Sequence, residues 1–153
     1  MSQKFNFNDQ SESQGLIFHH DHGGSGERYY IVTIGLGVSL FDYDNENDLD
    51  VYFCQGSPFP GWNKNINLEN KLFRYNNGKW TDVTSIAGVG DASYSFRCAF
   101  EDIDNDGDID IVVAKKNGPA NLLLRQGVPH KSWIGFNLMV KKQIGMLSEL
   151  VFT

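Results

Sequence analysis

The sequence F-E-D-I-D-N-D-G-D-I-D-I-V-V-A, residues 100–114, places five aspartates at alternate positions between two apolar runs. They are Asp102, Asp104, Asp106, Asp108 and Asp110. Sixty positions earlier the chain has L-F-D-Y-D-N-E-N-D-L-D-V-Y-F-C, residues 40–54, with acids at Asp42, Asp44, Glu46, Asp48 and Asp50. Five carboxylates within nine residues repel one another strongly unless a cation lies among them. The repeated pattern therefore predicts two cation-binding loops.

The spacing of the acids favours Ca²⁺, a hard cation that accepts many oxygen ligands. Carboxylates at loop positions 1, 3, 5 and 9 can turn toward one ion, and position 7 can supply a backbone carbonyl. Glycine at position 6, Gly107 in the second loop, permits the positive φ that reverses the chain. The apolar residue at position 8, Leu49 or Ile109, is expected to anchor each loop in the core.

These positions predict the ligands of each loop. In the second loop they are the side chains of Asp102, Asp104, Asp106 and Asp110, with the carbonyl of Asp108. In the first loop they are the side chains of Asp42, Asp44, Glu46 and Asp50, with the carbonyl of Asp48. Two features of the first loop differ, because Glu46 is one methylene longer than aspartate and Asn47 replaces the glycine. Asparagine tolerates the left-handed conformation, so the first site is expected to be weaker and distorted.

Three other interpretations of the acidic loops are less consistent with the residues. An EF-hand needs a glutamate at position 12 and flanking helices, whereas Phe53 and Val113 occupy that position here between strand-like runs. A glycosidase places its two acids on opposite sides of a cleft, not in one loop. The remaining alternative is a solvated acidic loop that binds nothing.

Composition indicates one folded domain. The chain has 153 residues, of which 41% are hydrophobic and 13% aromatic. Its net charge of −6 arises in the loops, because 11 of the 19 acidic residues lie within 42–50 and 101–110. The 13 lysines and arginines form no stripe, which argues against nucleic acid. The sequence contains no apolar run of about 18 residues, so no membrane span is expected. Its polar N-terminal residues do not form a signal peptide.

Two smaller groups of residues leave alternatives open. Cys54 and Cys98 are either buried free thiols or a disulfide between neighbouring repeats, and the sequence does not establish the geometry that a disulfide needs. The cluster His19, His20, Asp21, His22 is expected to form an ordinary hydrogen-bonded loop, and a transition-metal site is the alternative.

The remaining pattern predicts an all-β fold. No segment keeps a 3.6-residue apolar period over three turns, so helix should be scarce. Residues 70–84 predict a hairpin with its turn at Asn77-Gly78, and residues 121–127 repeat its first strand in weakened form. Short strands, glycine-rich turns and a repeat near 60 residues favour a β-propeller, in which a blade of four strands is the unit.

The motif F-x-D-x-D-N-D-G-x-x-D followed by a β run resembles the FG-GAP or VCBS repeat of integrin α-subunits and bacterial surface proteins. Residues 15–140 also resemble the ASPIC/UnbV group, relatives of cartilage acidic protein, in the order of four segments. These are G-L-I-F-H-H-D-H-G-G-S-G-E-R-Y-Y, G-V-S-L-F-D-Y-D-N-E-N-D-L-D-V-Y-F, N-K-L-F-R-Y-N-N-G-K-W-T-D-V-T-S-I-A-G-V-G-D and F-E-D-I-D-N-D-G-D-I-D-I-V-V-A-K-K-N-G-P-A-N-L-L-L-R-Q-G. The resemblance implies a seven-bladed propeller with calcium in its loops. The chain would be a fragment holding about two blades and part of a third.

We expect three segments along the chain. Residues 1–15 form a flexible lead, 16–127 the FG-GAP/VCBS-like propeller repeats, and 128–153 the start of an ASPIC/UnbV-like segment. The tail K-K-Q-I-G-M-L-S-E-L-V-F-T departs from the family pattern. A frameshift near Lys142 is our hypothesis for this departure, and the encoding DNA would test it.

The expected function is that of a non-enzymatic calcium-binding propeller module of an extracellular or cell-surface protein. Its partner would be an unknown protein or carbohydrate ligand, and other blades would lie outside this chain. The alternative is the propeller scaffold of a secreted lyase or hydrolase. No G-x-S-x-G or H-E-x-x-H motif supports that alternative. A pocket with converging polar groups away from the acidic loops would favour it.

Overall fold

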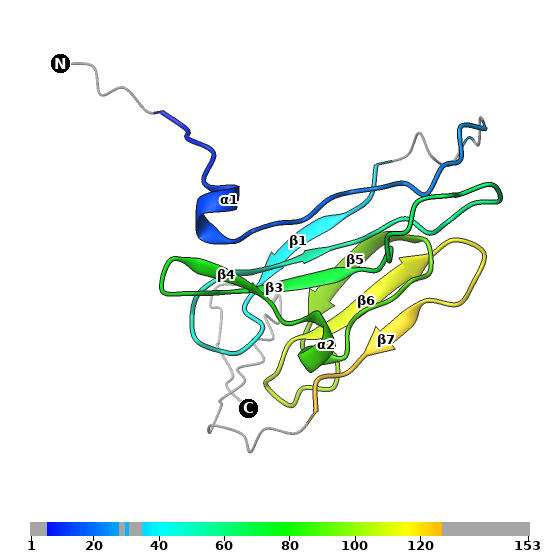
Figure 1. Ribbon diagram of the computed structural model, residues 1–153. Coiled ribbons are helices and arrows are strands. Elements are labelled where there is room, and N and C mark those ends of the chain that lie inside the picture. The colour runs from blue at the N-terminus through cyan, green and yellow to red at the C-terminus, as the bar shows by residue number, and fades with distance from the viewer. Residues whose placement is uncertain (1–5, 28–29, 31–34, 127–153) are drawn as a thin grey trace, which may run out of the picture.

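The computed structural model describes residues 6–27, 30 and 35–126, and these residues form two antiparallel sheets with two one-turn helices (Figure 1). The first sheet has the order β1 (Val38–Phe41), β2 (Asp50–Phe53), β3 (Lys71–Asn76), β4 (Lys79–Asp82). The second sheet has the order β5 (Ser95–Glu101), β6 (Asp110–Lys115), β7 (Asn121–Leu123). The helices are α1 (Ser11–Gln14) and α2 (Thr84–Ala87). For the residues that the structure describes, the prediction of a β-rich fold with scarce helix is confirmed.

The first sheet is a meander in which each strand pairs with the next one along the chain. Its β3–β4 hairpin turns at Asn77 and Gly78, whose φ angles are 50° and 78°. Two consecutive positive φ angles are typical of the type I′ turn, which matches the twist of the flanking strands. The predicted hairpin is therefore present, and the sheet has the four strands expected of one blade.

The second sheet repeats the beginning of the first. In each sheet an acidic loop joins two antiparallel strands, and an aspartate begins the second strand of the pair. Asp50 lies opposite Phe41 in the β1–β2 register, and Asp110 lies opposite Glu101 in the β5–β6 register. The sequence repeat of 60 positions is thus a structural repeat.

The third strands of the two sheets, β3 and β7, also correspond. Their structural alignment differs by one residue from the alignment that the sequence repeat predicts. The backbone N–H groups of Tyr75 and Arg125 donate equivalent hydrogen bonds to Asp50 and Asp110. Tyr75 and Arg125 are therefore structural equivalents, whereas the sequence repeat would pair Arg125 with Arg74.

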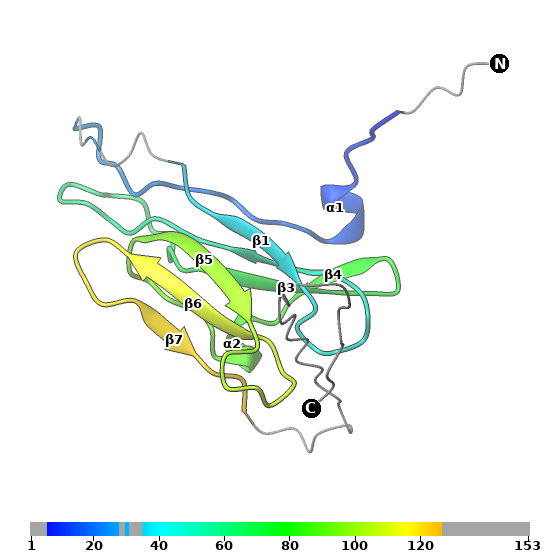
Figure 2. The ribbon, with the colours of Figure 1, turned by 180° about the vertical axis from the view of Figure 1, so that it is seen from behind.

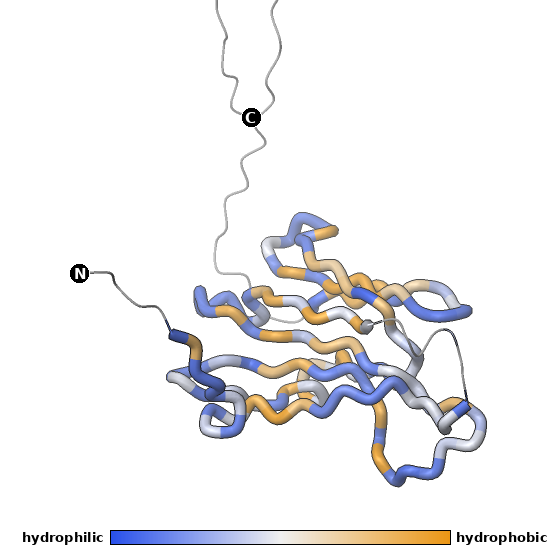
Figure 3. Tube along the Cα trace, turned by 90° about the horizontal axis from the view of Figure 1, so that it is seen from above, coloured by the Kyte–Doolittle hydropathy of each residue, from blue (hydrophilic) through white to orange (hydrophobic). Residues whose placement is uncertain are grey.

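The two sheets pack through aromatic side chains. β1 and β5 lie next to each other, as both ribbon views show (Figures 1 and 2). The rings of Phe41 and Phe100 stack with centroids 4.2 Å apart, and Tyr52 contacts Phe100 edge to face at 6.0 Å. The buried Tyr52 hydroxyl donates a hydrogen bond to the carbonyl of Val89 at 3.0 Å, so its polar group is satisfied in the core. Apolar positions concentrate along the strands and polar ones at the loops (Figure 3).

The expected anchoring of the loops by Leu49 and Ile109 is correct for one loop only. Ile109 is partly buried and packs against the core between the sheets, but Leu49 is 55% exposed. Because Leu49 and Ile109 are equivalent in the repeat, they face the same way from their own sheets. Ile109 therefore meets the first sheet, whereas no described sheet packs on the side that Leu49 faces.

Several predictions remain untested by this structure. The proposed segment 128–153, with its suggested frameshift near Lys142, lies outside the described residues. The closed propeller and the segment boundaries stay predictions as well. Within the described part of the chain, no helix is long and apolar enough to cross a membrane.

Candidate functional site

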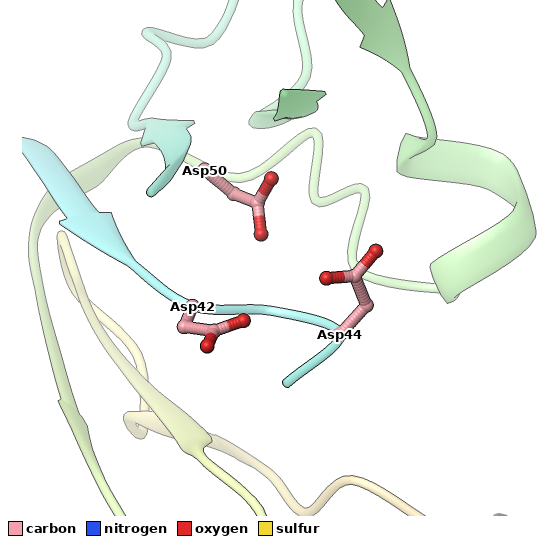
Figure 4. Close-up of side chains that lie close together, drawn as sticks. All are labelled: Asp42, Asp44 and Asp50. Carbon is pink, nitrogen blue, oxygen red and sulfur yellow. The ribbon is translucent and has the colours of Figure 1, made fainter. Parts of the chain in front are cut away.

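The first acidic loop brings three carboxylates together. Oxygen atoms of Asp42, Asp44 and Asp50 all lie within 4.8 Å of one another. Figure 4 shows the three side chains converging from the end of β1, the loop and the start of β2. All the donors in this group are carboxylate oxygens, the ligand type that Ca²⁺ and Mg²⁺ prefer.

Hydrogen bonds within the loop hold two of these carboxylates in place. The Asp42 carboxylate accepts from the N–H groups of Glu46 at 3.1 Å and Asn47 at 2.9 Å, which closes the loop. The Asp50 carboxylate accepts from the N–H groups of Tyr43 and Tyr75, each at 2.7 Å. Asp50 thereby connects the loop to β3. Each oxygen retains a further lone pair for a cation.

The third carboxylate of the first loop lacks such support. Asp44 Oδ1 is buried and has no hydrogen-bond partner, and Oδ2 lies 3.7 Å from Arg74 Nη1 in an ion pair. Asp48 Oδ1 is likewise buried without a partner. Burial raises the pKa of Asp50, opposed by its two backbone hydrogen bonds, and the charges of Asp44 and Asp48 raise it further. The loop thus concentrates negative charge that nearby protein groups balance incompletely.

The second acidic loop has the same internal hydrogen bonds. Asp102 accepts from the N–H groups of Asp106 and Gly107, both at 3.0 Å, as Asp42 does in the first loop. Asp110 accepts from the N–H groups of Ile103 and Arg125, both at 2.9 Å, as Asp50 does. The two loops therefore fold in the same way, although their sequences differ at several positions.

A different set of acids converges in the second loop. Here the group within 4.8 Å is Asp102, Asp104 and Asp106, with Asp104 exposed. Slight desolvation by neighbouring atoms, together with the nearby charges of Asp106 and Asp110, raises the pKa of the exposed Asp104. Asp106 joins this group, whereas its counterpart Glu46 is exposed and outside the first one.

The two acids at loop position 7 were predicted to bind through their backbone carbonyls. The Asp108 side chain accepts hydrogen bonds from Asn45 Nδ2 at 2.8 Å and from Arg125 Nη1 at 2.9 Å. Because Asn45 belongs to the first loop, its bond to Asp108 joins the two loops directly. Sequence reasoning missed this link.

The reversal at loop position 6 is confirmed in both loops. Gly107 has φ 92° and its replacement Asn47 has φ 65°. The structure adds a second reversal two residues earlier, at Asn45 and Asn105, with φ of 62° and 60°. Asparagine at the same position of both loops was the available sequence signal, since asparagine is enriched in this conformation.

The histidine cluster forms a hydrogen-bonded loop. The buried Asp21 accepts from Lys64 Nζ at 2.6 Å and from Gly23 N–H at 2.9 Å, and its own N–H donates to Gln55 Oε1. His22 Nδ1 accepts from the N–H of Gly24 at 2.9 Å. Among the described residues, groups of carboxylate, imidazole and thiol ligands close enough for a metal occur only in the two acidic loops.

A cavity of about 590 Å³ lies between the sheets and borders the first acidic loop. Most of its lining is apolar and includes Phe41, Val89, Ile111 and Leu123. Asp44, Arg74 and Arg125 bring charge to it. This cavity adjoins the carboxylates and is not separate from them.

Comparison with protein families identifies part of the chain. The sequence model of the FG-GAP-like repeat matches residues 57–113, so the chain contains an FG-GAP-like repeat. The matched part runs from the loop after β2 through the second acidic loop into β6. No curated protein and no solved structure matches the chain.

Proposed function

We propose that this chain is a calcium-stabilised, non-enzymatic β-propeller module. An FG-GAP-like repeat at residues 57–113 suggests an extracellular or adhesion-type propeller module. The observation that carries the calcium assignment is the convergence of Asp42, Asp44 and Asp50 within 4.8 Å, together with a second group of three aspartates within 4.8 Å in the other loop. Two similar loops with only oxygen donors fit a hard cation.

The residues in each loop have distinct parts in this proposal. In the first loop Asp42, Asp44 and Asp50 hold the ion, and the unpartnered Asp44 Oδ1 supplies a free ligand atom. In the second loop Asp102, Asp104 and Asp106 hold it, with Asp110 completing the set as predicted from position 9. The carbonyls of Asp48 and Asp108 and the Glu46 carboxylate are the further ligands that the spacing predicts.

The cation serves stability in this proposal. Burial and neighbouring charges raise the pKa of Asp50, so ionised Asp50 opposes folding at neutral pH unless a cation compensates it. An unfolded chain has no preformed site, and the free energy of binding therefore adds to the free energy of unfolding. A ligand at 100 times its dissociation constant stabilises the folded chain by about 2.7 kcal/mol.

We further propose that the module belongs to the ASPIC/UnbV group and works outside the cell or at its surface. Such a module would serve adhesion, or binding to a protein or carbohydrate ligand. The resemblance of residues 15–140 to that group supports this placement, as does the matched repeat within it. Completion of a propeller would need blades in addition to the two sheets described here.

Calcium titration tests the proposal. The chain is first treated with a chelator and dialysed. The midpoint of its thermal unfolding is then measured as the Ca²⁺ concentration is raised to several times the dissociation constant of weak extracellular sites, which is about 1 mM. We expect the midpoint to rise with Ca²⁺ and Asp104→Ala to remove most of that rise. Asp44→Ala should remove less, because the first loop is predicted to be the weaker site.

Glu12→Ala is the matched control, because Glu12 is an exposed acid in α1, outside both loops. This variant should retain the full rise. An unchanged midpoint in the parent chain would refute a structural role for calcium. A rise that survives both loop substitutions would place the ion elsewhere.

A further inference from the structure

The two cysteines lie at the contact between the sheets, although 44 positions separate them in the sequence. Cys54 directly follows β2 in the first sheet and is 1% exposed. Cys98 lies in β5 of the second sheet, is partly exposed, and packs against the core cluster that contains Cys54. Each sheet thus contributes one thiol to a shared interface.

Backbone pairing brings the strands that carry these thiols together. Cys54 N–H donates to the carbonyl of Gly37 at 2.9 Å, and Gly37 N–H donates to the carbonyl of Phe96 at 2.9 Å. Gly37 therefore connects the end of β2 with β5. The close approach of β5 favours glycine at this position, because a Cβ there would lie 3.2 Å from Arg97 Cα and 3.3 Å from the carbonyl oxygen of Phe96.

The side chains converge on the same space. Cys98 Sγ lies 3.5 Å from Ser39 Oγ of β1, so it points toward the first sheet. Cys54 Sγ lies on the same side of the first sheet as Ser39, because it lies 3.7 Å from the position that a Cβ at Gly37, two residues before Ser39, would take. Both cysteines are free in this structure, and neither takes part in the acidic loops.

We propose that Cys54 and Cys98 are a modification site at which oxidation forms a disulfide between the two sheets. The placement of both thiols in one packed cluster between the sheets, with Cys54 fully buried and Cys98 partly exposed, carries this assignment. The proposal is independent of calcium binding.

The oxidant is a small-molecule disulfide, and the two thiols have different parts. The Cys98 thiolate attacks one sulfur of the oxidant, which forms a mixed disulfide and releases the first small thiolate. Cys54 then attacks Cys98 Sγ, which forms the Cys54–Cys98 bond and releases the second small thiolate. The two protein thiols lose two electrons and two protons, and the oxidant becomes two small thiols.

The partly exposed Cys98 suits the first step. The hydrogen bond from Cys54 lowers the pKa of Cys98 to about 7 against the effect of burial, so much of it is thiolate near neutral pH. The same hydrogen bond and burial raise the pKa of Cys54, which keeps its proton until Cys98 has reacted.

The test uses the whole reduced chain in mixtures of reduced and oxidised glutathione, in native buffer and in urea. Acid stops the exchange, free thiols are alkylated, and mass spectrometry identifies the peptides. We expect both thiols of the native monomer to be lost together, with the Cys54 and Cys98 peptides linked. Linkage should require less oxidised glutathione in native buffer than in urea, because only the folded chain holds both thiols in one cluster.

Two serine variants separate the steps. Cys54→Ser should stop at a mixed disulfide between Cys98 and glutathione, since it lacks the second thiol. Cys98→Ser should keep the Cys54 thiol free, because Cys54 is buried. The proposal is overturned if the native parent chain keeps two free thiols, stops at the mixed disulfide, or forms the link no more readily than in urea.

Discussion

Asp50 and Asp110 explain at the level of single residues how the acidic loops are tied to the sheets. Their side chains are 0% and 1% exposed, yet every carboxylate oxygen accepts a backbone hydrogen bond. One oxygen accepts from the loop and the other from the next strand. Each aspartate therefore fixes the loop relative to the sheet without the help of a cation. It also places carboxylate oxygens where a cation can bind.

Cys98 gives a prediction about pH. Its pKa of about 7 depends first on the hydrogen bond from Cys54. In the reduced chain, we expect the rate of Cys98 alkylation by iodoacetamide to rise with a midpoint near that pH. Cys54→Ala should move the midpoint upward, toward the ordinary cysteine value of about 8.5, because the thiolate loses its donor. Cys54→Ser, which keeps a hydroxyl donor, should give an intermediate midpoint, and an unchanged midpoint in the alanine variant would contradict this account.

Asp91 gives a prediction about acid stability. Its carboxylate pairs with Lys115 and accepts hydrogen bonds from Asn121 Nδ2 at 2.6 Å and Ser93 N–H at 2.7 Å. Burial tends to raise the pKa of Asp91, but the bonds from Lys115 and Ser93 outweigh it and the pKa is lowered. We expect Asp91→Asn to lower the free energy of unfolding at pH 7 by about 2 kcal/mol, less than for a fully buried pair because both side chains retain some contact with water.

The sign of the pH effect follows from the lowered pKa of Asp91. Its contribution is fully present above the unfolded-state pKa of about 3.9 and is lost as pH falls through the lower folded-state value. The difference between the parent chain and Asp91→Asn should therefore shrink below about pH 4. Urea unfolding of both chains at pH 7 and pH 3 measures this difference in the free energy of unfolding. A difference that is the same at both pH values would show that the charge of Asp91 does not cause the loss of stability.

At the level of the elements, the reversal in each acidic loop depends on the residue at position 6. Gly107→Ala should lower the free energy of unfolding by about 1–2 kcal/mol, because an L-residue resists the left-handed conformation. Asn47→Ala should cost less, since asparagine already bears part of that strain. Chemical unfolding in the presence of a chelator separates this effect from cation binding.

Gly118→Ala is the control for the loop substitutions. Gly118 lies between β6 and β7 without a positive φ, and a Cβ there would lie 4.0 Å from the nearest atom, the carbonyl oxygen of Lys116. Its replacement should leave stability nearly unchanged. Equal costs at Gly107 and Gly118 would show that backbone conformation does not determine the folding of the acidic loop.

The elements also show how far the sequence could predict the structure. Local signals sufficed for the Asn77-Gly78 hairpin and for the two loops, because turn chemistry and alternation act between neighbours. The link between Asn45 and Asp108 joins residues 63 positions apart, and no local pattern contains it. The exposure of Leu49 and the equivalence of Arg125 with Tyr75 likewise depend on how the sheets pack and on strand register.

At the level of the whole molecule, the two sheets cover each other on one side only. Phe41 and Tyr52 of the first sheet face the second sheet and are buried. Val38 and Leu40 alternate with the inward residues of β1 and are 58% and 59% exposed. On the second sheet, Leu122 of β7 is 53% exposed. Apolar side chains thus lie on surfaces that further blades, as proposed above, would cover.

These exposed side chains predict self-association of the chain. Exposed apolar patches on sheets favour contact with another sheet, and burial of apolar area drives it. We expect the sedimentation coefficient of the parent chain to rise with concentration. The double variant Val38→Thr, Leu40→Thr should weaken this dependence and leave the fold intact, because threonine is β-branched and suits a strand. Ile66→Thr is the matched control, since Ile66 is 52% exposed in a loop outside both sheets. If the double variant associates as strongly as the parent chain, the outer face of β1 is not the contact, and association through the open edges of the sheets becomes the better account.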